Sequence, residues 1–390
     1  MFDDTKLSKA GTNTEDNFGI MNPPIYRAST IHFPTISSFN SRFDRRFDEV
    51  VYGSYGTPTT KALETAIAEL ENANRCMVLT SGTAAISLTF MACVKPGDHV
   101  LISDGVYKST RTLCETLLTK LNIKISFFHP EAGENLENQI LPETRLVFLE
   151  SPSSFTFETQ DIPAITKICR RKGILTAIDN TWASPLFFKP LDHGVDISTQ
   201  AATKYLCGHS DVMMGSISVK DEKLFKTIKD VAIQFGNSVS PADCYLALRG
   251  IRTMAIRLRQ HQETALQLVN WLIKRPEVNN ILYPAWPNDP GYSLWERDFS
   301  GASGLFGVIL EPTYEKAVST FIEGLKYFRI GASWGGYESL MIPSYPIRSF
   351  AASNWQERGP LLRVHAGLED ARDLIDDLDE GFSRITSSES

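Results

Sequence analysis

Short apolar segments alternate with helical patterns through the first half of the chain, and this alternation is the feature that most constrains the fold. Four segments have strand character, at 76–79, 100–102, 146–149 and 174–178, and helical patterns such as 162–171 separate them. Such alternation predicts a largely parallel sheet covered by helices. We therefore expect an α/β fold whose ligand binds beyond the carboxyl ends of the strands.

Three regions are expected along the 390 residues. Residues 1–55 show little periodicity and contain turn-forming residues, so we interpret them as an extended N-terminal arm. Residues 56–245 carry the alternating pattern and form the expected ligand-binding domain. Residues 246–390 form a smaller C-terminal α/β domain, with a long helix over 241–273 bridging the two domains and strands at 305–310 and 363–365.

Composition narrows the class of function. The net charge of −7 argues against an extended surface for nucleic acid or acidic lipid. Six scattered cysteines without C-x-x-C spacing indicate free thiols in a reducing compartment and no structural zinc site. The N-terminus lacks a signal pattern, and no apolar run reaches the roughly 18–20 residues that span a bilayer. We expect a cytoplasmic enzyme with a small-molecule substrate, no metal, and neither a nucleic-acid nor a membrane partner.

One lysine and one upstream aspartate indicate the chemistry. Lys204 follows Asp179 by 25 residues. Asp179 comes directly after the apolar segment 174–178, and Glu150 comes directly after the preceding one, 146–149. Taken singly, a loop lysine is usually solvated, and Asp-Asn-Thr after a strand is ordinary turn chemistry. Together they suit pyridoxal 5'-phosphate (PLP), whose aldehyde binds a lysine amine and whose pyridine nitrogen needs a carboxylate partner. We therefore expect PLP as the cofactor.

Other residues can complete a PLP site, although each also has an ordinary structural explanation. Gly82 and Thr83 open a predicted helix, where backbone N–H groups bind phosphate or the helix is simply capped. Thr203 places a hydroxyl beside Lys204 within reach of the same phosphate. Tyr107, after a strand, can stack on a flat ring or merely be half-buried. Arg363 can bind a carboxylate with two parallel hydrogen bonds, or form a surface ion pair.

With these residues assembled, the chain resembles the Cys/Met-metabolism family of fold-type I PLP enzymes from about residue 20 to 385. The most specific matching segments are 179–183, 200–205, 208–211, 257–261, 333–339 and 367–370. The resemblance implies that Lys204 and Tyr107 are catalytic, and that PLP is bound by Lys204, Asp179, Tyr107, Gly82, Thr83, Thr203 and Tyr52.

The resemblance also implies how substrate and subunits are arranged. Arg363 takes the substrate carboxylate, and Ser333, Trp334, Ser154 and Tyr52 are the further substrate-binding residues. Tyr52 matches a tyrosine that the family lends from one subunit to the site of its neighbour. A homotetramer built from active-site-sharing dimers is the implied assembly, with the N-terminal arm contacting the neighbouring subunit.

Three positions depart from the family pattern. Ser54 stands where an arginine usually crosses the subunit interface to the phosphate, and Arg45 or Arg46 are candidate replacements. Ser154 stands where most members have asparagine. Ala201 replaces a second phosphate-binding serine, as also occurs in the branch that performs β-elimination.

The reaction expected from the resemblance is β-elimination. Enzymes of the γ-branch usually carry a glutamate two residues before a Leu-Gly-Gly segment, whereas this chain has Ala332 at that position and Trp334 in place of the leucine. We therefore expect L-cystathionine to be cleaved to L-homocysteine, pyruvate and ammonia in methionine biosynthesis. The alternatives are a cystathionine or methionine γ-lyase, a sulfhydrylase of homoserine derivatives, a cysteine desulfhydrase and, more remotely, a non-catalytic regulator of the same fold.

Overall fold

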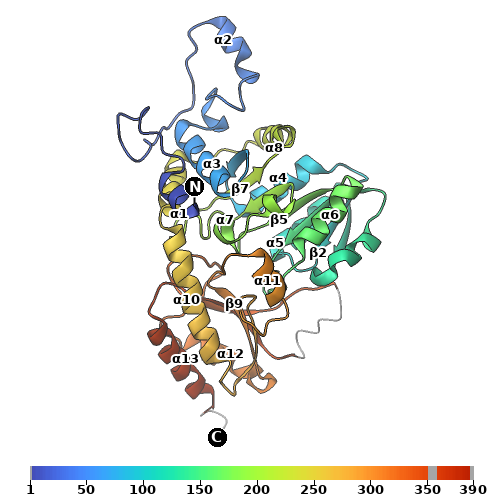
Figure 1. Cartoon of the computed structure of the whole chain (residues 1–390), viewed down its shortest axis with the longest axis vertical. Helices are drawn as coiled ribbons and strands as arrows, with labels where there is room; N and C mark the ends of the chain where they lie inside the picture. Colours follow the sequence, from blue (N-terminus) through green and yellow to red (C-terminus); the bar gives the residue numbers. More distant parts are fainter. Residues whose placement is uncertain (1, 350–357, 387–390) are drawn as a thin grey trace.

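The computed structural model describes residues 2–349 and 358–386 and arranges them in two lobes, each built around one sheet (Figure 1). This architecture confirms the predicted α/β fold. Residue 1 of the predicted arm, and residues 350–357 and 387–390 of the predicted C-terminal domain, lie outside the described residues. The three domain boundaries themselves stay predictions.

The larger sheet has seven strands in the order β1-β7-β6-β5-β4-β2-β3. Its strands are β1 (Arg75–Leu79), β2 (His99–Ser103), β3 (Lys124–Phe128), β4 (Thr144–Glu150), β5 (Leu175–Asp179), β6 (Ile197–Gln200) and β7 (Gly215–Val219). Strands β2, β3, β4, β5 and β6 are mutually parallel, while β7 runs antiparallel to both β6 and β1. All four predicted strands of the first half are therefore confirmed.

Helices surround this sheet, and apolar side chains pack on both of its faces. They are α3 (Pro58–Leu70), α4 (Gly82–Cys93), α5 (Lys108–Leu113), η3 (Cys114–Leu118), η4 (Pro130–Gln139), α6 (Ile162–Lys172), α7 (Ser184–Phe187), η5 (Pro190–His193) and α8 (Glu222–Gln234). Local sequence explains their ends: α6 begins at the N-cap Asp161 and stops at Gly173, which adopts the left-handed conformation common after helices.

The smaller sheet is antiparallel, with the order β10-β11-β9-β8. Its strands are β8 (Val278–Leu282), β9 (Leu305–Leu310), β10 (Leu340–Ser344) and β11 (Leu361–His365). Helices α10 (Met254–Leu272), α11 (Tyr292–Asp298), η6 (Pro312–Ala317), α12 (Val318–Glu323) and α13 (Ala371–Thr386) accompany it. In Figure 1, α10 runs from the larger lobe along the side of the smaller one.

The prediction of one long helix over 241–273 was wrong, because α9 (Pro241–Ile251) and α10 are separate helices. The break lies beside Gly250, where an added Cβ atom would be only 2.2 Å from the carbonyl oxygen of Cys207. Arg257 donates to the carbonyl of Gly250 at 2.8 Å and replaces a bond that a continuous helix would make. Close packing against the loop after Lys204 therefore overrides the helical pattern.

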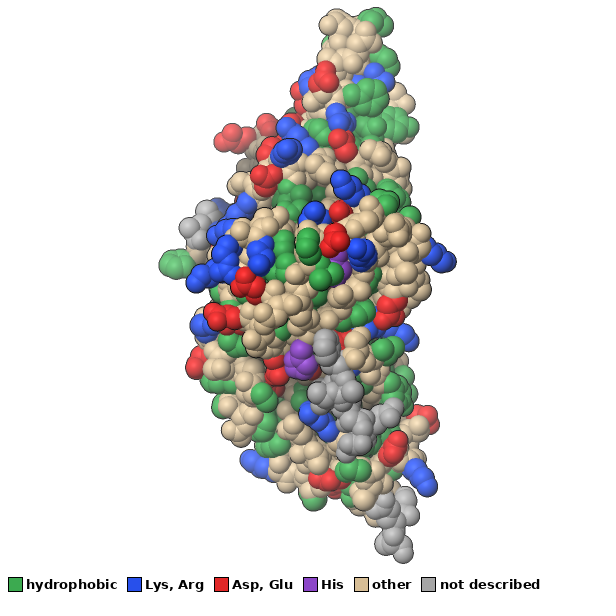
Figure 2. Space-filling model, turned by 90° about the vertical axis from the view of Figure 1, so that its right-hand side faces the viewer, with side chains coloured by type: hydrophobic (Ala, Val, Ile, Leu, Met, Phe, Trp, Pro, Cys, Tyr) green, Lys and Arg blue, Asp and Glu red, His purple; other side chains and the backbone are tan. Residues whose placement is uncertain are grey.

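The N-terminal arm is mostly irregular, as predicted. Its short helical segments are α1 (Asp3–Lys9), α2 (Ile36–Asn40), η1 (Ser41–Phe43) and η2 (Gly53–Tyr55). While α1 packs on α3 and α10, the part around α2 projects away from the body (Figure 1). Phe18 is 97% exposed and Ile36 is 75% exposed, and Figure 2 shows hydrophobic side chains on the projection. These exposed side chains leave apolar area of the arm uncovered in the described part of its own chain.

None of the helices in the described ranges combines the length and apolar character that crossing a membrane requires.

Candidate active site

Lys204 lies in the loop that follows β6, and its side chain reaches the smaller lobe. Its Nζ donates a hydrogen bond to Ser333 Oγ at 2.6 Å and lies 5.3 Å from the ring centroid of Trp334. Burial, and then the charge of Arg363, lower the pKa of Lys204 to about 8 against the opposing charge of Asp179. An amine in this state can both accept and return a proton near neutral pH.

Asp179 ends β5 and is held by Thr181, a residue that the sequence analysis did not single out. The backbone N–H of Thr181 donates to Asp179 Oδ1 at 3.0 Å, and its hydroxyl donates to the same oxygen. Asp179 Oδ2 accepts no hydrogen bond within the described residues and is left for a ligand. Burial raises the pKa of this carboxyl, while the Thr181 bonds and then Lys204 act against that rise.

Thr181 also links Asp179 to the lysine loop. Its hydroxyl oxygen accepts the backbone N–H of Ala201 at 2.8 Å, three residues before Lys204. The hydroxyl therefore fixes the aspartate and the loop together. Its position as the third residue of the Asp-Asn-Thr segment was the only signal for this role in the sequence.

Arg363, on β11, approaches the site from the smaller lobe. Its Nη2 donates to the carbonyl oxygens of Ser333 at 2.9 Å and Gly331 at 3.3 Å. Burial lowers its pKa to about 10. Within the described ranges no carboxylate pairs with this guanidinium, so it keeps donors for a carboxylate ligand.

Tyr107 follows β2 and presents its ring beside the same strand ends. Its backbone N–H donates to Glu150 Oε2 at 2.7 Å, and its side chain is 38% exposed. The Phe155 ring lies 6.3 Å away at an interplanar angle of 27°. One face of Tyr107 is thus supported, and the exposed ring area suits stacking on a flat ligand.

The start of α4 has the properties of an anion site. The Ser81 hydroxyl caps the helix by accepting the Ala84 N–H at 3.0 Å, and the N–H groups of Gly82 and Thr83 donate to no other described residue. A Cβ atom on Gly82 would lie 2.6 Å from Ala201 Cβ, so glycine is required for close approach to the lysine loop. Free N–H groups at a helix start attract phosphate.

Thr203 fits its predicted role less directly. Its hydroxyl donates to the carbonyl of Met214 at 3.0 Å and accepts the N–H of the same residue at 2.9 Å. Because its one proton is engaged, Thr203 must exchange that bond before it can donate to a phosphate. Its role in phosphate binding stays a prediction.

Ser154 and Tyr52 lie differently with respect to this site. The Ser154 backbone bonds Gly105 at 2.7 Å, and the following residue, Phe155, contacts both Tyr107 and Arg363. Tyr52 lies in the arm, 47% exposed, with Tyr55 as its ring neighbour at 6.3 Å. The chain therefore brings Phe155, the neighbour of Ser154, to its own site, whereas no described contact joins Tyr52 to that site.

The two candidates to replace the arginine missing at Ser54 are both engaged. Arg46 forms an ion pair with Asp230 at 2.8 Å, and Arg45 pairs with Glu49. Either side chain would have to leave its partner to reach a phosphate.

These groups fit PLP. Asp179 Oδ2 is free for the pyridine nitrogen, the α4 amides for the phosphate, and the Lys204 amine for the aldehyde, while the ring of Tyr107 is exposed for stacking. The guanidinium of Arg363 has further donors that suit a carboxylate, and its role as the substrate anchor stays a prediction.

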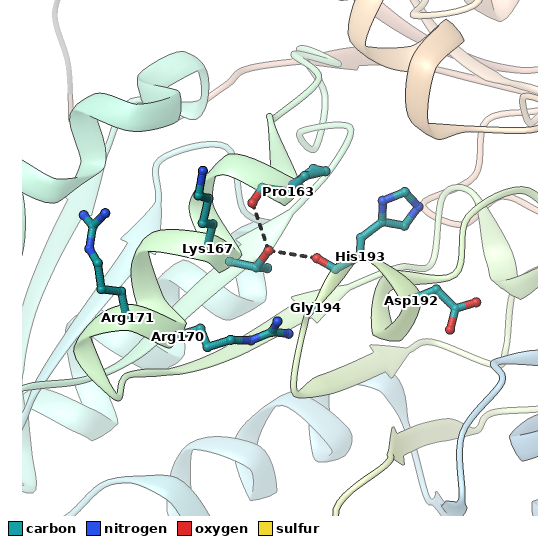
Figure 3. A pocket seen from close by; sticks show the side chains of 8 residues that line it. Pro163, Lys167, Arg170, Arg171, Asp192, His193 and Gly194 are labelled. Carbon is teal, nitrogen blue, oxygen red and sulfur yellow. Dashed lines mark hydrogen bonds between the residues drawn. The ribbon is translucent and has the colours of Figure 1, made fainter.

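A separate groove of about 600 Å³ lies between α6 and η5, lined by Pro163, Thr166, Lys167, Arg170, Arg171, Asp192, His193 and Gly194 (Figure 3). Because α6 leads into the start of β5 and η5 into the start of β6, this groove is at the opposite ends of the strands from Asp179 and Lys204. Its basic residues complement the negative end of the α6 dipole. The groove is therefore distinct from the candidate active site.

Known proteins of one family match this chain over nearly its whole length. The sequence model of the family described as "Cys/Met metabolism PLP-dependent enzyme" matches residues 4–383. The Escherichia coli protein named "Cystathionine beta-lyase MetC" is 38% identical over 389 residues, covering 98% of each chain. The Wolbachia pipientis protein named "L-alanine/L-glutamate racemase" is 39% identical over 398 residues, covering 99% of this chain and 98% of that one. The solved structure of cystathionine gamma-lyase from Lactobacillus plantarum complexed with L-serine has a TM-score of 0.90 at 30% identity, covering 99% of this chain and 100% of that one.

Proposed function

Since this chain belongs to the Cys/Met metabolism PLP-dependent enzyme family, we propose that it is a cystathionine β-lyase, which cleaves L-cystathionine to L-homocysteine, pyruvate and ammonia in methionine biosynthesis. The family membership establishes the cofactor and the general chemistry. The particular substrate and the β-elimination are the proposal.

The observation that carries this proposal is the joint position of Lys204, Ser333 and Arg363. Lys204 bonds the side chain of Ser333, and Arg363 bonds the backbone carbonyl of the same residue. A substrate whose α-carboxylate binds Arg363 therefore has its α-carbon held near the lysine amine. Such an arrangement places a proton acceptor at the α-carbon and lowers the entropic cost of reaching it.

Each remaining residue has a defined task in this proposal. PLP, when bound, supplies a ring that absorbs the negative charge left by loss of the α-proton. Asp179 holds the proton on the pyridine nitrogen, and Tyr107 covers one ring face. Lys204 takes the α-proton and returns a proton to the departing sulfur.

The neighbourhood of Lys204 supports β-elimination over the γ-reactions. Among the described residues Lys204 forms no ion pair with a carboxylate, and the position of the γ-branch glutamate is held by Ala332. The nearby group is instead the indole of Trp334, whose centroid is 5.3 Å from Nζ. One acid–base group at the α-carbon suffices for β-elimination, which needs no proton removal from the β-carbon.

The assembly we propose is a cytoplasmic homotetramer of dimers that share active sites. Two observations support this arrangement. The arm exposes hydrophobic residues, and Tyr52 makes no described contact with the site of its own chain. All six cysteines are unpaired, which is typical of a reducing compartment.

A substrate panel tests the proposal. The PLP-loaded protein is incubated separately with L-cystathionine, L-cystine, L-cysteine, an O-acylated homoserine with sulfide, and L-alanine. We expect the highest kcat/KM for L-cystathionine. Preference for cysteine, for the homoserine derivative, or for racemisation of alanine would assign the chain to another branch of the family.

A further inference from the structure

Glu150 occupies the place between two residues that the proposed function assigns to the cofactor. It ends β4, and in the parallel register of the sheet it lies directly beside Asp179 at the end of β5. On its other side, its carboxylate accepts the backbone N–H of Tyr107 at 2.7 Å. A single side chain therefore touches the segment that carries the ring-stacking tyrosine and adjoins the aspartate.

The backbone of Glu150 is itself fixed. Its carbonyl oxygen accepts the Gln160 amide at 2.5 Å, and the same amide nitrogen donates to Ser103 Oγ at 2.8 Å. Ser103 ends β2, the strand that leads to Tyr107. Gln160 thus links the ends of β2 and β4 through hydrogen bonds. The side chain of Glu150 adds a second link between these strand ends by accepting the Tyr107 N–H.

Tyr107 depends on this contact because its own segment gives it little support. It occupies the N-cap position of α5, yet its side chain makes no capping bond. Substituting the acceptor would remove the side-chain partner of this N–H and allow the start of α5 to shift. A shift there moves the Tyr107 ring relative to the cofactor plane.

Two adjacent carboxyl groups cannot both be charged at low cost. Burial, and then the charge of Asp179, raises the pKa of Glu150 well above its usual range, against the Tyr107 N–H and Arg348. Two hydrogen bonds from Thr181 favour the charged form of Asp179, and so does the nearby charge of Lys204. Of the two carboxyl groups, Glu150 is therefore the one that holds a proton more readily, and Asp179 the one that is more readily ionised.

We propose that Glu150 is a positioning residue for the cofactor: as a neutral hydrogen-bond acceptor it fixes the Tyr107 backbone, and it leaves the single negative charge of the strand ends to Asp179. This inference rests on the proposed cofactor roles of Tyr107 and Asp179, and not on the choice of substrate.

Three substitutions separate a neutral acceptor from a charged group and from simple packing. Glu150→Gln keeps an acceptor oxygen of the same reach without a charge. Glu150→Asp keeps the acid but is one methylene too short to reach the Tyr107 N–H. Glu150→Leu keeps the volume and removes the acceptor.

The readouts are the visible circular dichroism of bound PLP and the PLP dissociation constant, measured on the holoenzyme without substrate. We expect Glu150→Gln to match the unsubstituted protein, and Glu150→Leu and Glu150→Asp to bind PLP roughly tenfold more weakly with an altered visible signal, as loss of one hydrogen bond implies. Glu143→Gln, directly before the same strand and paired with Lys124, is the matched control.

Two results would overturn the inference: equal loss in Glu150→Gln and Glu150→Leu, or unchanged PLP binding and signal in both Glu150→Leu and Glu150→Asp. If Glu150→Leu does not fold, as judged by far-ultraviolet circular dichroism, the comparison of Gln with Asp decides. Because no substrate is present, failure to cleave L-cystathionine would contradict the proposed function and leave these readouts intact.

Discussion

The amine of Lys204 donates to the hydroxyl of Ser333 at 2.6 Å, and the carbonyl of Ser333 accepts from Arg363 at 2.9 Å. One residue of the smaller lobe therefore connects the proposed base, carried by the larger lobe, with the proposed carboxylate anchor. The relative position of these two groups depends on how the lobes pack, and this packing decides which substrate atom faces the amine.

Replacing Lys204 by alanine should abolish turnover, because the same amine binds the cofactor and moves the α-proton. Pyruvate formation from L-cystathionine measures the loss, and far-ultraviolet circular dichroism checks that the variant folds. Lys189→Ala, which removes a lysine bonded to Leu70 and Pro185 elsewhere, serves as the comparison. Substantial activity in Lys204→Ala would rule out the assignment.

The rate should depend on pH through Lys204. Its pKa is lowered to about 8 by burial, so the amine is protonated below that pH and cannot accept the α-proton. We expect kcat to rise as the pH increases through about 8 and then to level off. In Ser333→Ala, loss of the acceptor that stabilises the ammonium form should move this rise to lower pH. A kcat that is flat between pH 6.5 and 9, or an unmoved profile in the variant, contradicts the assigned role.

Replacing Arg363 by lysine should impair substrate binding despite the retained charge. Lysine cannot keep the bonds to Ser333 and Gly331 and also present a planar pair of donors to a carboxylate. A lost charged hydrogen bond corresponds to about 10- to 100-fold in kcat/KM. Steady-state kinetics should show the loss mainly in KM, with the visible spectrum of bound PLP unchanged. An unchanged KM would exclude Arg363 as the anchor.

Mixing two inactive variants tests whether Tyr52 acts across a subunit interface. Lys204→Ala and Tyr52→Ala are each expected to have low activity. In a mixed dimer, one site combines an intact Lys204 with an intact Tyr52 from the other subunit, so co-refolding should restore about a quarter of the sites. If Tyr52 served its own subunit, no intact site would form and activity would not return.

Much of the fold could be predicted from sequence because apolar strands and helical segments alternate over 76–178. The helix break beside Gly250 could not, since it depends on contact with the Cys207 carbonyl, more than 40 residues away in the chain. The antiparallel direction of β7 also escaped prediction, because an isolated apolar segment does not reveal the direction of its partner.

The candidate site, like the fold, could be predicted from sequence only in part. Lys204 and Asp179 could be singled out because a loop lysine and an upstream strand-end aspartate suit PLP when they are taken together. The contacts of Thr181 and Glu150 depend on strand register and side-chain direction, which a single sequence does not specify. The role of Tyr52 depends on a second chain and stays a prediction.

The most direct measurement is identification of the keto acid formed when the PLP-loaded protein is incubated with L-cystathionine. β-Elimination predicts pyruvate together with homocysteine and ammonia. 2-Oxobutyrate together with cysteine would contradict the account and place the protein in the γ-lyase branch.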